Sequence, residues 1–379
     1  MALTGTTDTP LGPPAPLLDG LDRLSRRIGH LDPLTLLSVR AALLGLGRGG
    51  TTSCGGGCRL LRTDDAWIAV SLVRPDDIEA VPAWLECGPV PAPTEAMWDA
   101  VATAVAPKDA ADVVERGILL GLPIALVGGA PARPPVDATA LGVAAARADL
   151  DGLRVVDLTS LWAGPLCGDL LARAGALVTK VESLARPDGA RRGPVAFFDL
   201  LNGHKRSVAL DLTAERDRTQ LAALVASADV VLEASRPRAL EQLGLSASDV
   251  VASGGPQVWV SITGYGRGGA GSERVAFGDD AAAGGGLVAD EMGQPRFCGD
   301  AIADPLSGLS AFDACVEALE SGGRWLLDVS MSAVAGSMAG PTLPLADGLV
   351  AAPPRARTVA RPAPPFGAHT AEVLAELGV

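Results

Sequence analysis

The stretch 151–182, DGLRVVDLTSLWAGPLCGDLLARAGALVTKVE, decides the fold of this chain. Residues 153–158 form a short apolar run with β-branched side chains, which predicts a buried parallel strand. After a turn, residues 166–174 repeat apolar side chains at helical spacing until Gly175 ends the pattern. Residues 176–181 predict the next strand. The stretch is therefore a βαβ unit, and its first strand-to-helix turn is where open α/β sheets hold ligands.

The alternation of strands and helices continues along the rest of the chain. Further strands are predicted at 228–234, 257–263 and 325–329, and residues 197–202 and 204–212 together predict a turn and a strand. Helices are predicted at 215–226, 237–243, 305–320, 332–338 and 370–377. We therefore expect an α/β fold whose larger domain is a doubly wound parallel sheet.

The first part of the chain predicts a second, smaller α/β (α+β) domain. It contains a helical pattern at 31–46, a Gly-rich loop at 51–58, a hairpin at 59–73, helices at 76–85, 94–105 and 110–120, and a strand at 123–127. The expected boundaries are a mobile tail at 1–25, the small domain at 26–130, a linker at 131–149, and a large domain at 150–379.

Composition excludes several classes of protein. The formal net charge of −13 argues against a nucleic-acid or anionic-membrane binder, because both need a basic face. We find no run of 18 apolar residues and no signal-peptide pattern at the start of the sequence. The six scattered cysteines suggest reduced thiols. We expect a cytoplasmic protein without membrane or nucleic-acid partners.

Two motifs raise other possibilities. Cys54 and Cys58 enclose three glycines and could be half of a metal site, but no second Cys/His pair lies near them in the sequence. The segment GYGRGG at 264–269 follows a strand, yet it lacks the G-x-G-x-x-G spacing and the acidic residue that a dinucleotide site needs. We therefore predict neither a metal nor a nicotinamide site.

From residue 150 onward the chain resembles the family III CoA-transferases, which include formyl-CoA and carnitine-CoA transferases. The matching segments, in the family's order, are the 151–182 stretch, NGHKRSVALDL, ADVVLEASRPRALEQLGL, VWVSITGYG, IADPLSGL, LLDVSM and FGAHTAEVLAELG. Members usually insert a small domain between the last two segments. Here GGTTSCGGGCRLLRTDDAWIAVSLV and LGLPIALV resemble that domain's two ends but precede residue 150, so we infer a circular permutation.

The resemblance implies a CoA-transferase that moves CoA from an acyl-CoA donor to a carboxylic acid acceptor. Asp304 in IADPLSGL matches the nucleophile, which forms an aspartyl mixed anhydride and then an aspartyl-CoA thioester. From the residues alone, Asp304 could instead cap its helix, and Asp300 is a rival carboxylate. CoA would be a substrate and carrier rather than a permanently bound cofactor, and the family's dimers imply a homodimer.

The resemblance also implies a set of CoA contacts. These are Trp162 and Ala163 near the pantetheine, Leu210 and Leu212 at the adenine pocket, Ala234, Arg236, Ala239, Gln242 and Leu243 beside the nucleotide, and Thr263 after the next strand. Ser183, Thr213, Gln242 and Thr263 stand where the formyl-CoA enzyme has basic side chains. Arg186, Arg191, Arg192, Arg236 and Arg238 could replace that charge, or they could form a solvated face.

Three further alternatives stay open at this stage. The loop of Gly55, Gly56 and Gly57 is either a lid over the active site or an ordinary connection into the hairpin. A related branch of the fold racemises α-methylacyl-CoA esters with a His/Asp pair, but Asp279 occupies the His position here, which disfavours that reaction. A chain with eroded CoA contacts could also act as a non-catalytic acyl-CoA-binding or structural partner of a complete homologue.

Overall fold

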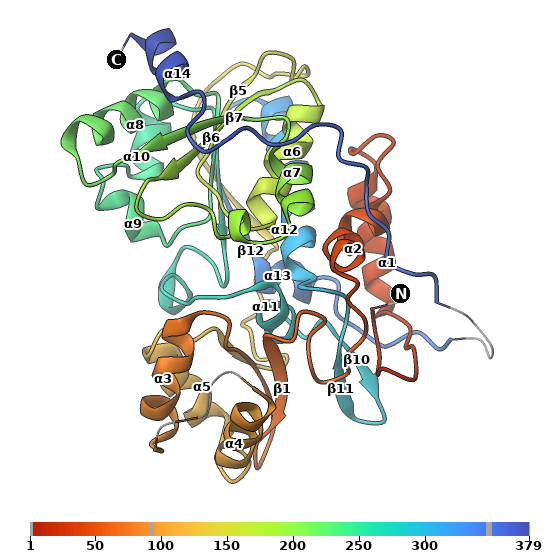
Figure 1. Ribbon diagram of the computed structural model, residues 1–379. Helices are drawn as coiled ribbons and strands as arrows, with labels where there is room; N and C mark the ends of the chain where they lie inside the picture. The colour runs from red at the N-terminus through yellow and green to blue at the C-terminus, as the bar shows by residue number, and fades with distance from the viewer. Residues whose placement is uncertain (1–2, 89, 91–93, 346–350, 379) are drawn as a thin grey trace.

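The computed structural model describes residues 3–88, 90, 94–345 and 351–378 (Figure 1). Its main element is a seven-stranded sheet in the order β4-β12-β9-β8-β5-β6-β7. The strands are β4 (Val136–Gly142), β5 (Arg154–Asp157), β6 (Leu177–Ser183), β7 (Arg206–Leu210), β8 (Val230–Glu233), β9 (Val258–Thr263) and β12 (Arg324–Ser330). All pairs are parallel except β4 with β12. The strand order reverses between β5 and β8, so the predicted doubly wound α/β fold is confirmed.

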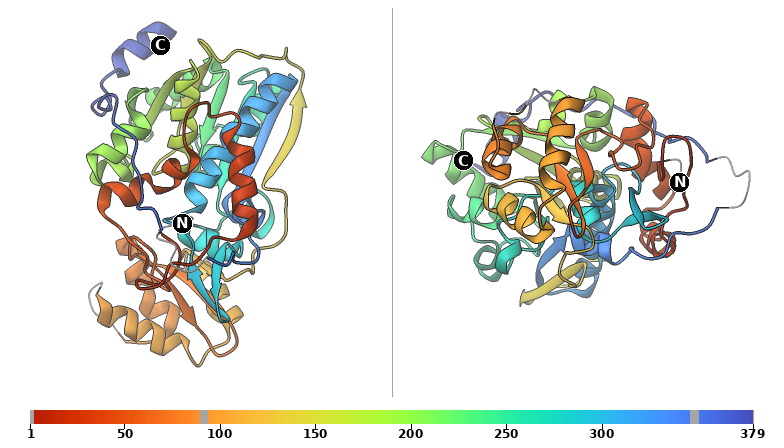
Figure 2. Two further views of the ribbon diagram at one scale, coloured as in Figure 1. Left: turned by 90° about the vertical axis from the view of Figure 1, so that its right-hand side faces the viewer. Right: turned by 90° about the horizontal axis from the view of Figure 1, so that it is seen from below.

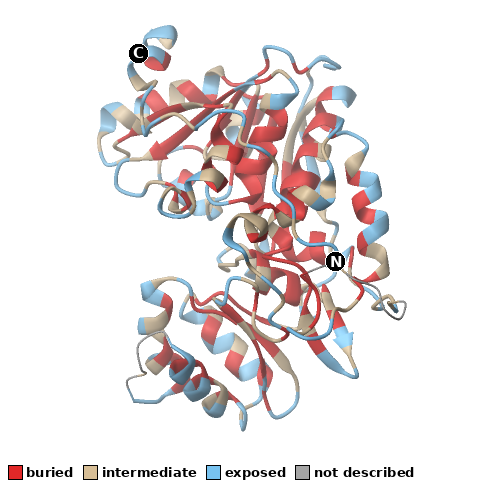
Figure 3. Cartoon of the chain, turned by 45° about the vertical axis from the view of Figure 1, so that its right-hand side comes forward, coloured by how far each residue is buried: buried red, intermediate tan, exposed pale blue. Residues whose placement is uncertain are grey.

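Alternate residues of the central strands point into two separate cores. Val155 and Val230 belong to one core, whereas their neighbours Val156 and Val231 belong to the other. The first core is covered by α6 (Ala163–Arg173), α7 (Val195–Asn202), α12 (Ala303–Ser321) and α13 (Met331–Gly336), and the second by α8 (Glu215–Ser227), α9 (Pro237–Glu241), α10 (Ala247–Ala252) and α14 (Thr370–Leu377). Figure 3 shows the resulting buried layers on the sheet. Burial on both faces explains the nearly continuous apolar runs of these strands.

A smaller unit lies below the large sheet in Figure 1. It is an antiparallel sheet of β1 (Cys58–Arg62), β2 (Trp67–Ser71) and β3 (Ile124–Leu126), with α3 (Pro75–Leu85), α4 (Glu95–Val105) and α5 (Ala110–Leu119). These elements have a core of their own that includes Ile68, Val81 and Met97. The predicted smaller α/β domain and its hairpin are therefore confirmed. The unit meets the rest of the chain through contacts of β2 and β3 with α11 (Gly278–Gly284).

The prediction of a mobile tail at 1–25 is wrong. Residues Ala15–Ser25 form α1, whose Leu17, Leu21 and Leu24 are buried in the first core of the large sheet. The next helix, α2 (Pro33–Leu44), packs in the same core. The predicted start of the small domain at residue 26 is therefore wrong. Figure 2 shows this N-terminal segment, in red, beside the C-terminal part of the chain. The Pro-rich start concealed the helix because Pro14 and Pro16 flank its first residue, where proline is tolerated.

The predicted linker at 131–149 is also wrong in its central part. Residues Val136–Gly142 form β4, which pairs with β12 at the edge of the large sheet. Arg133 holds the approach to this strand, since its Nη2 donates to Asp328 Oδ2 at 2.6 Å and its Nη1 to the Tyr265 carbonyl at 2.9 Å. Most of β4 is exposed, so its sequence lacks the apolar pattern by which a strand is recognised.

Two further elements differ from the prediction. Residues Val195–Asn202 form α7 rather than part of a turn and strand. Phe197, Leu200 and Leu201 lie at helical spacing and are buried in the first core, which favours the helix. The hairpin of β10 (Val288–Glu291) and β11 (Gln294–Phe297) was not predicted. Within the described ranges we find no helix with the length and apolar character needed to cross a lipid bilayer.

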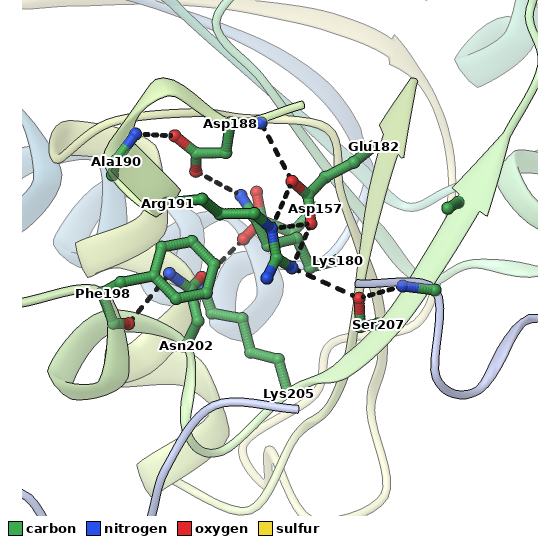
Figure 4. A network of polar contacts seen from close by, with 12 residues as sticks. Asp157, Lys180, Glu182, Asp188, Ala190, Arg191, Phe198, Asn202, Lys205 and Ser207 are labelled. Carbon is green, nitrogen blue, oxygen red and sulfur yellow. Dashed lines mark hydrogen bonds and ion pairs between the residues drawn. The ribbon is translucent and has the colours of Figure 1, made fainter. Parts of the chain in front are cut away.

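A buried network of charges fixes the carboxyl ends of β5 and β6 (Figure 4). Lys205 donates to Asp157 Oδ2 at 2.7 Å and to the Pro165 carbonyl at 2.9 Å. Lys180 pairs with Asp188 at 2.8 Å. All four charged side chains are at most 1% exposed. Burial alone would raise the pKa of Asp157, but the two lysines overcome it and leave that pKa lowered.

We expect Lys205→Met to lower the free energy of unfolding by about 3–5 kcal/mol, because it leaves Asp157 buried without its partner. Urea denaturation measures this loss. The double variant with Asp157→Asn should recover part of the stability, since it removes the unpaired charge. Arg26→Ala is the control: it breaks an exposed pair with Asp22 and should cost less than about 1 kcal/mol. A loss that small for Lys205→Met would show that the network is not needed for stability.

Candidate active site

Four aspartates meet where α11 and α12 begin. Asp279 and Asp280 lie in the first turn of α11, Asp304 lies in the first turn of α12, and Asp300 precedes α12. Asp280 and Asp300 are fully buried, whereas Asp279 and Asp304 are half-buried. The Ala301 N–H donates to Asp279 Oδ1 at 2.9 Å, which ties the two helix starts together.

The backbone at the start of α11 and the loop before α12 lie close to the Asp304 carboxylate. A side chain at Gly278 would collide with Asp304 Oδ2 and with the Ala301 carbonyl, so glycine is required there. Ala301 itself has a φ of 43°, in the left-handed region that non-glycine residues rarely occupy. The N-cap of α12 is Ile302, whose side chain makes no capping hydrogen bond. The interpretation of Asp304 as a helix cap is therefore wrong, and its carboxylate is left for another role.

Arg40 brings a positive charge to this cluster from α2. Its Nε donates to Asp300 Oδ2 at 2.9 Å, and its Nη2 donates to Asp300 Oδ1, which gives a bidentate pair. The guanidinium lies 5.7 Å from the centre of the Trp162 ring. The ion pair therefore connects the N-terminal segment, the start of α6 and the loop before α12.

Burial changes the proton affinity of the cluster. It raises the pKa of Asp304 to about 7; Arg40 opposes this rise, and the neighbouring carboxylates add to it. Burial likewise raises the pKa of Asp280 to about 7, and burial together with Asp300 raises that of Asp279 to about 6. Near neutral pH the cluster therefore exchanges protons, as acid–base and nucleophilic sites do.

The Gly-rich loop lies against these aspartates. The Ser53 hydroxyl bonds the Asp279 carboxyl, and Cys54 Sγ donates to the Gly299 carbonyl at 3.2 Å. A side chain on Gly55 would lie 3.2 Å from Arg40 Nη2. Gly55 and Gly56 are exposed at the tip, and Gly57 packs against Val73. The loop thus has the location that a lid needs, and its closure stays a prediction.

The predicted CoA contacts follow the carboxyl ends of parallel strands, at one edge of the sheet. Trp162 and Ala163 are buried at the start of α6, where Trp162 packs edge-on against Phe197 at 5.2 Å between ring centres. A side chain on Gly308, one turn after Asp304, would collide with the Ala163 carbonyl, so this end of α6 lies close to the aspartates.

The other predicted contacts lie around α9 and the ends of β7 to β9. Leu210, Leu212 and Leu243 share the second core with Leu240. Ala234, Arg236, Ala239 and Gln242 are exposed on and beside α9. Thr263 is engaged within the protein: its hydroxyl donates to Asp328 Oδ1 at 3.2 Å and accepts from the Gly266 N–H at 2.8 Å. The sheet therefore carries these residues along the same edge, as the parallel topology requires.

The five candidate arginines separate into two groups. Arg191 pairs with Glu182 at 2.6 Å and lies 4.4 Å from the centre of the Phe198 ring, so it belongs to the structural network. Arg238 pairs with Glu273 at 3.1 Å. Arg186, Arg192 and Arg236 are exposed. Of the five arginines, these three exposed ones remain the candidates to bind phosphate.

Sequence reasoning missed Arg40, Ser53 and Cys54 as members of the site. The available signal was one arginine within the apolar helical run LTLLSVRAALL, because a charge at such a position needs a partner. The partner, Asp300, is 260 residues away along the chain, so only the fold could identify it.

Asp280→Asn should reduce the pH dependence of stability. A raised pKa means that the folded state binds a proton that the unfolded state has lost, so this stabilisation is complete below about pH 4 and disappears as pH rises through about 7. Wild-type stability should therefore fall relative to the variant by up to about 1.4 kcal/mol per pH unit in that window. The amide still accepts from Ser71 and Phe277.

Urea unfolding at a series of pH values measures the difference. Asp19→Asn, on the exposed side of α1, is the control and should follow the wild-type profile. Parallel profiles for wild type and Asp280→Asn would contradict the assignment of a raised pKa to Asp280.

Comparison with known proteins identifies the family. Residues 150–372 match the family model described as CoA-transferase family III. An acyl-CoA transferase of Fusarium pseudograminearum is 32% identical over 45% of this chain and 41% of its own length. A succinyl-CoA–D-citramalate CoA-transferase of Chloroflexus aurantiacus is 30% identical over 48% of this chain and 49% of its own. The chain thus spans about half the length of the curated relatives it matches.

Among solved structures, a CaiB/BaiF family protein from Brucella suis is 32% identical, with 49% of this chain and 54% of that chain covered and a TM-score of 0.45. The family match itself begins at residue 150, just before β5, and extends into α14. Since that match covers more than half of the sequence, the chain belongs to CoA-transferase family III.

Proposed function

We propose that this chain is an acyl-CoA:carboxylate CoA-transferase with Asp304 as its nucleophile. The observation that carries the proposal is the Asp304 carboxylate itself. It is half-buried in the first turn of α12, is not the N-cap of that helix, lies against Gly278, and is under the electrostatic influence of Arg40. Relatives of this chain are named as CoA-transferases or acyl-CoA transferases, which supports the same reaction.

The proposed reaction moves CoA from the donor's acyl group to the acceptor carboxylate in four steps. Asp304 attacks the thioester carbonyl of the donor, the C–S bond breaks, and a mixed anhydride and CoA thiolate result. The thiolate then attacks the Asp304 carbonyl, which releases the donor's carboxylate and leaves an aspartyl-CoA thioester. The acceptor carboxylate attacks that thioester and forms a second anhydride. The released thiolate finally attacks the acceptor's carbonyl, which yields the new acyl-CoA and restores Asp304.

The edge of the sheet offers places for the two ends of CoA. Trp162 and Ala163 lie near the aspartates and would adjoin the pantetheine end. Leu212 and Leu243 are partly exposed at the second core and would contact the adenine. The exposed Arg236 near Gln242 would meet phosphate. The loop of Gly55 to Gly57 would close over the thioester.

The order of domains supports a circular permutation. The family match starts at residue 150, and the small antiparallel unit of β1 to β3 precedes it in the chain. We propose that this unit is the family's small domain moved to the front, now bounded by about 58–126. We also propose that the chain functions as a homodimer in the cytoplasm, as its resemblance to the family implies.

Incubation with acyl-CoA should place CoA on Asp304. Mass spectrometry of the protein with acetyl-CoA, succinyl-CoA and decanoyl-CoA should detect a CoA-sized adduct, which hydroxylamine removes. Asp304→Asn should form none, because an amide is not the nucleophile the reaction needs. Asp19→Asn should form the wild-type amount.

Other outcomes have definite meanings. An adduct on Asp300 would keep the transferase and reassign the nucleophile. No adduct on any carboxylate, in a protein that still binds CoA, would favour the non-catalytic acyl-CoA-binding partner. That alternative has one structural feature in its favour, since Arg191 and Arg238 are already paired within the protein.

The rate of transfer should rise with pH. Only ionised Asp304 can attack, and its pKa is raised to about 7, so kcat/KM should fall as pH drops from about 8 to 6. Asp280→Asn should move the midpoint to lower pH, because the Asp280 charge raises the pKa of Asp304. A profile that is flat over this range would contradict a neutral-pH nucleophile at Asp304.

A further inference from the structure

Arg40 has one donor group that the protein does not use. Its Nε and Nη2 bond Asp300, whereas Nη1 has no hydrogen-bond partner among residues 3–88, 90, 94–345 and 351–378. The side chain is 26% exposed although its partner Asp300 is fully buried. One edge of the guanidinium is thus fixed by the fold, and the other is available to a ligand.

The Gly55 loop and the Trp162 ring border the guanidinium of Arg40. A Cβ on Gly55 would lie 3.2 Å from Nη2 and 3.6 Å from Nη1, so glycine at this position keeps a side chain from crowding the guanidinium. On another side the Trp162 ring lies 5.7 Å from the guanidinium carbon. Arg40 also acts electrostatically on Asp279 and on Asp304, the proposed nucleophile.

We propose that Arg40 contacts the substrate and binds the carboxylate of the acceptor acid as it attacks the aspartyl-CoA thioester. This inference rests on the proposed function. Asp300 is then a positioning residue, since its two oxygens hold the guanidinium in one orientation. Acceptor recognition comes from α2, which lies outside the segment matched to the family.

The charge of the site explains why such a group is needed. In the two middle steps of the exchange an anion attacks the carbonyl of Asp304, first the CoA thiolate and then the acceptor carboxylate. Asp279, Asp280 and Asp300 lie around the same position, and their ionised forms would repel it. A guanidinium with a free N–H offers the approaching carboxylate a charge-assisted hydrogen bond and a compensating positive charge.

The test separates the two halves of the reaction. The double variant Arg40→Gln with Asp300→Asn removes the cation and leaves no unpaired buried charge, so it avoids the folding defect expected of Arg40→Gln alone. The aspartyl-CoA adduct is formed at pH 8 from succinyl-CoA, freed of donor, and then mixed with acetate, succinate or glutarate. Mass spectrometry follows the loss of the adduct with time.

We expect the double variant to form the adduct and to discharge it to carboxylates about 10-fold to 100-fold more slowly than wild type. That range is the loss of one hydrogen bond to a charged group. The acceptor KM should change more than kcat, and added guanidinium should restore part of the rate. Arg40→Lys should retain an intermediate rate, because it keeps the charge without the bidentate geometry. Arg27→Gln, which breaks pairs with Asp313 and Glu320 instead, is the matched control.

The opposite results are equally definite. A double variant that forms the adduct and discharges it at the wild-type rate overturns the role of Arg40 and leaves the proposed function standing. Failure of wild type to form any adduct overturns the proposed function, and the role of Arg40 with it.

Discussion

The bidentate ion pair of Arg40 with Asp300 is the interaction on which the candidate site depends. Asp300 has no exposed surface, so its charge requires a partner within the protein. That partner comes from α2, at the other end of the sequence. The pair therefore ties the N-terminal segment to the loop before α12, and the position of Asp304 follows from that loop. It also gives a reason for the burial of α1 and α2 in the large core rather than in the small unit.

A second set of buried charges fixes the other side of the same edge. The sequence contains three lysines, Lys108, Lys180 and Lys205, and arginine supplies the remaining cations. Two of the three are the buried members of the network at β5 and β6. A compact ammonium with three donors fits a closed space where a planar guanidinium would need more room. The network thereby holds the turn that leads to Trp162 and the start of α6.

The sequence predicted those elements whose own residues carry the signal. The unit of β5, α6 and β6 was found because its strands are buried on both faces and Gly175 follows shortly after its helix. The strand β4 was missed because an exposed edge strand needs no apolar residues, and its stability comes from pairing with β12. The helix α1 was missed because prolines surround its start. In both cases tertiary contacts outweigh the local pattern.

The site was predictable to a similar degree. Asp304 could be named through resemblance, because the segment IADPLSGL is continuous in sequence. Arg40 could not, since its partner is remote and an arginine on a helix is usually a surface residue.

The four aspartates and one arginine form a site whose charge is adjustable. Fully ionised, the cluster would hold three more negative than positive charges in a buried space, which is strongly unfavourable. Burial relieves this by raising the pKa of Asp280 and Asp304 to about 7, so protons occupy part of the cluster near neutral pH. When Asp304 becomes an anhydride or thioester it loses its negative charge, so the net charge of the cluster becomes less negative and the positive charge of Arg40 is less compensated. The site is thus most receptive to an anion at the stage when an anion must attack.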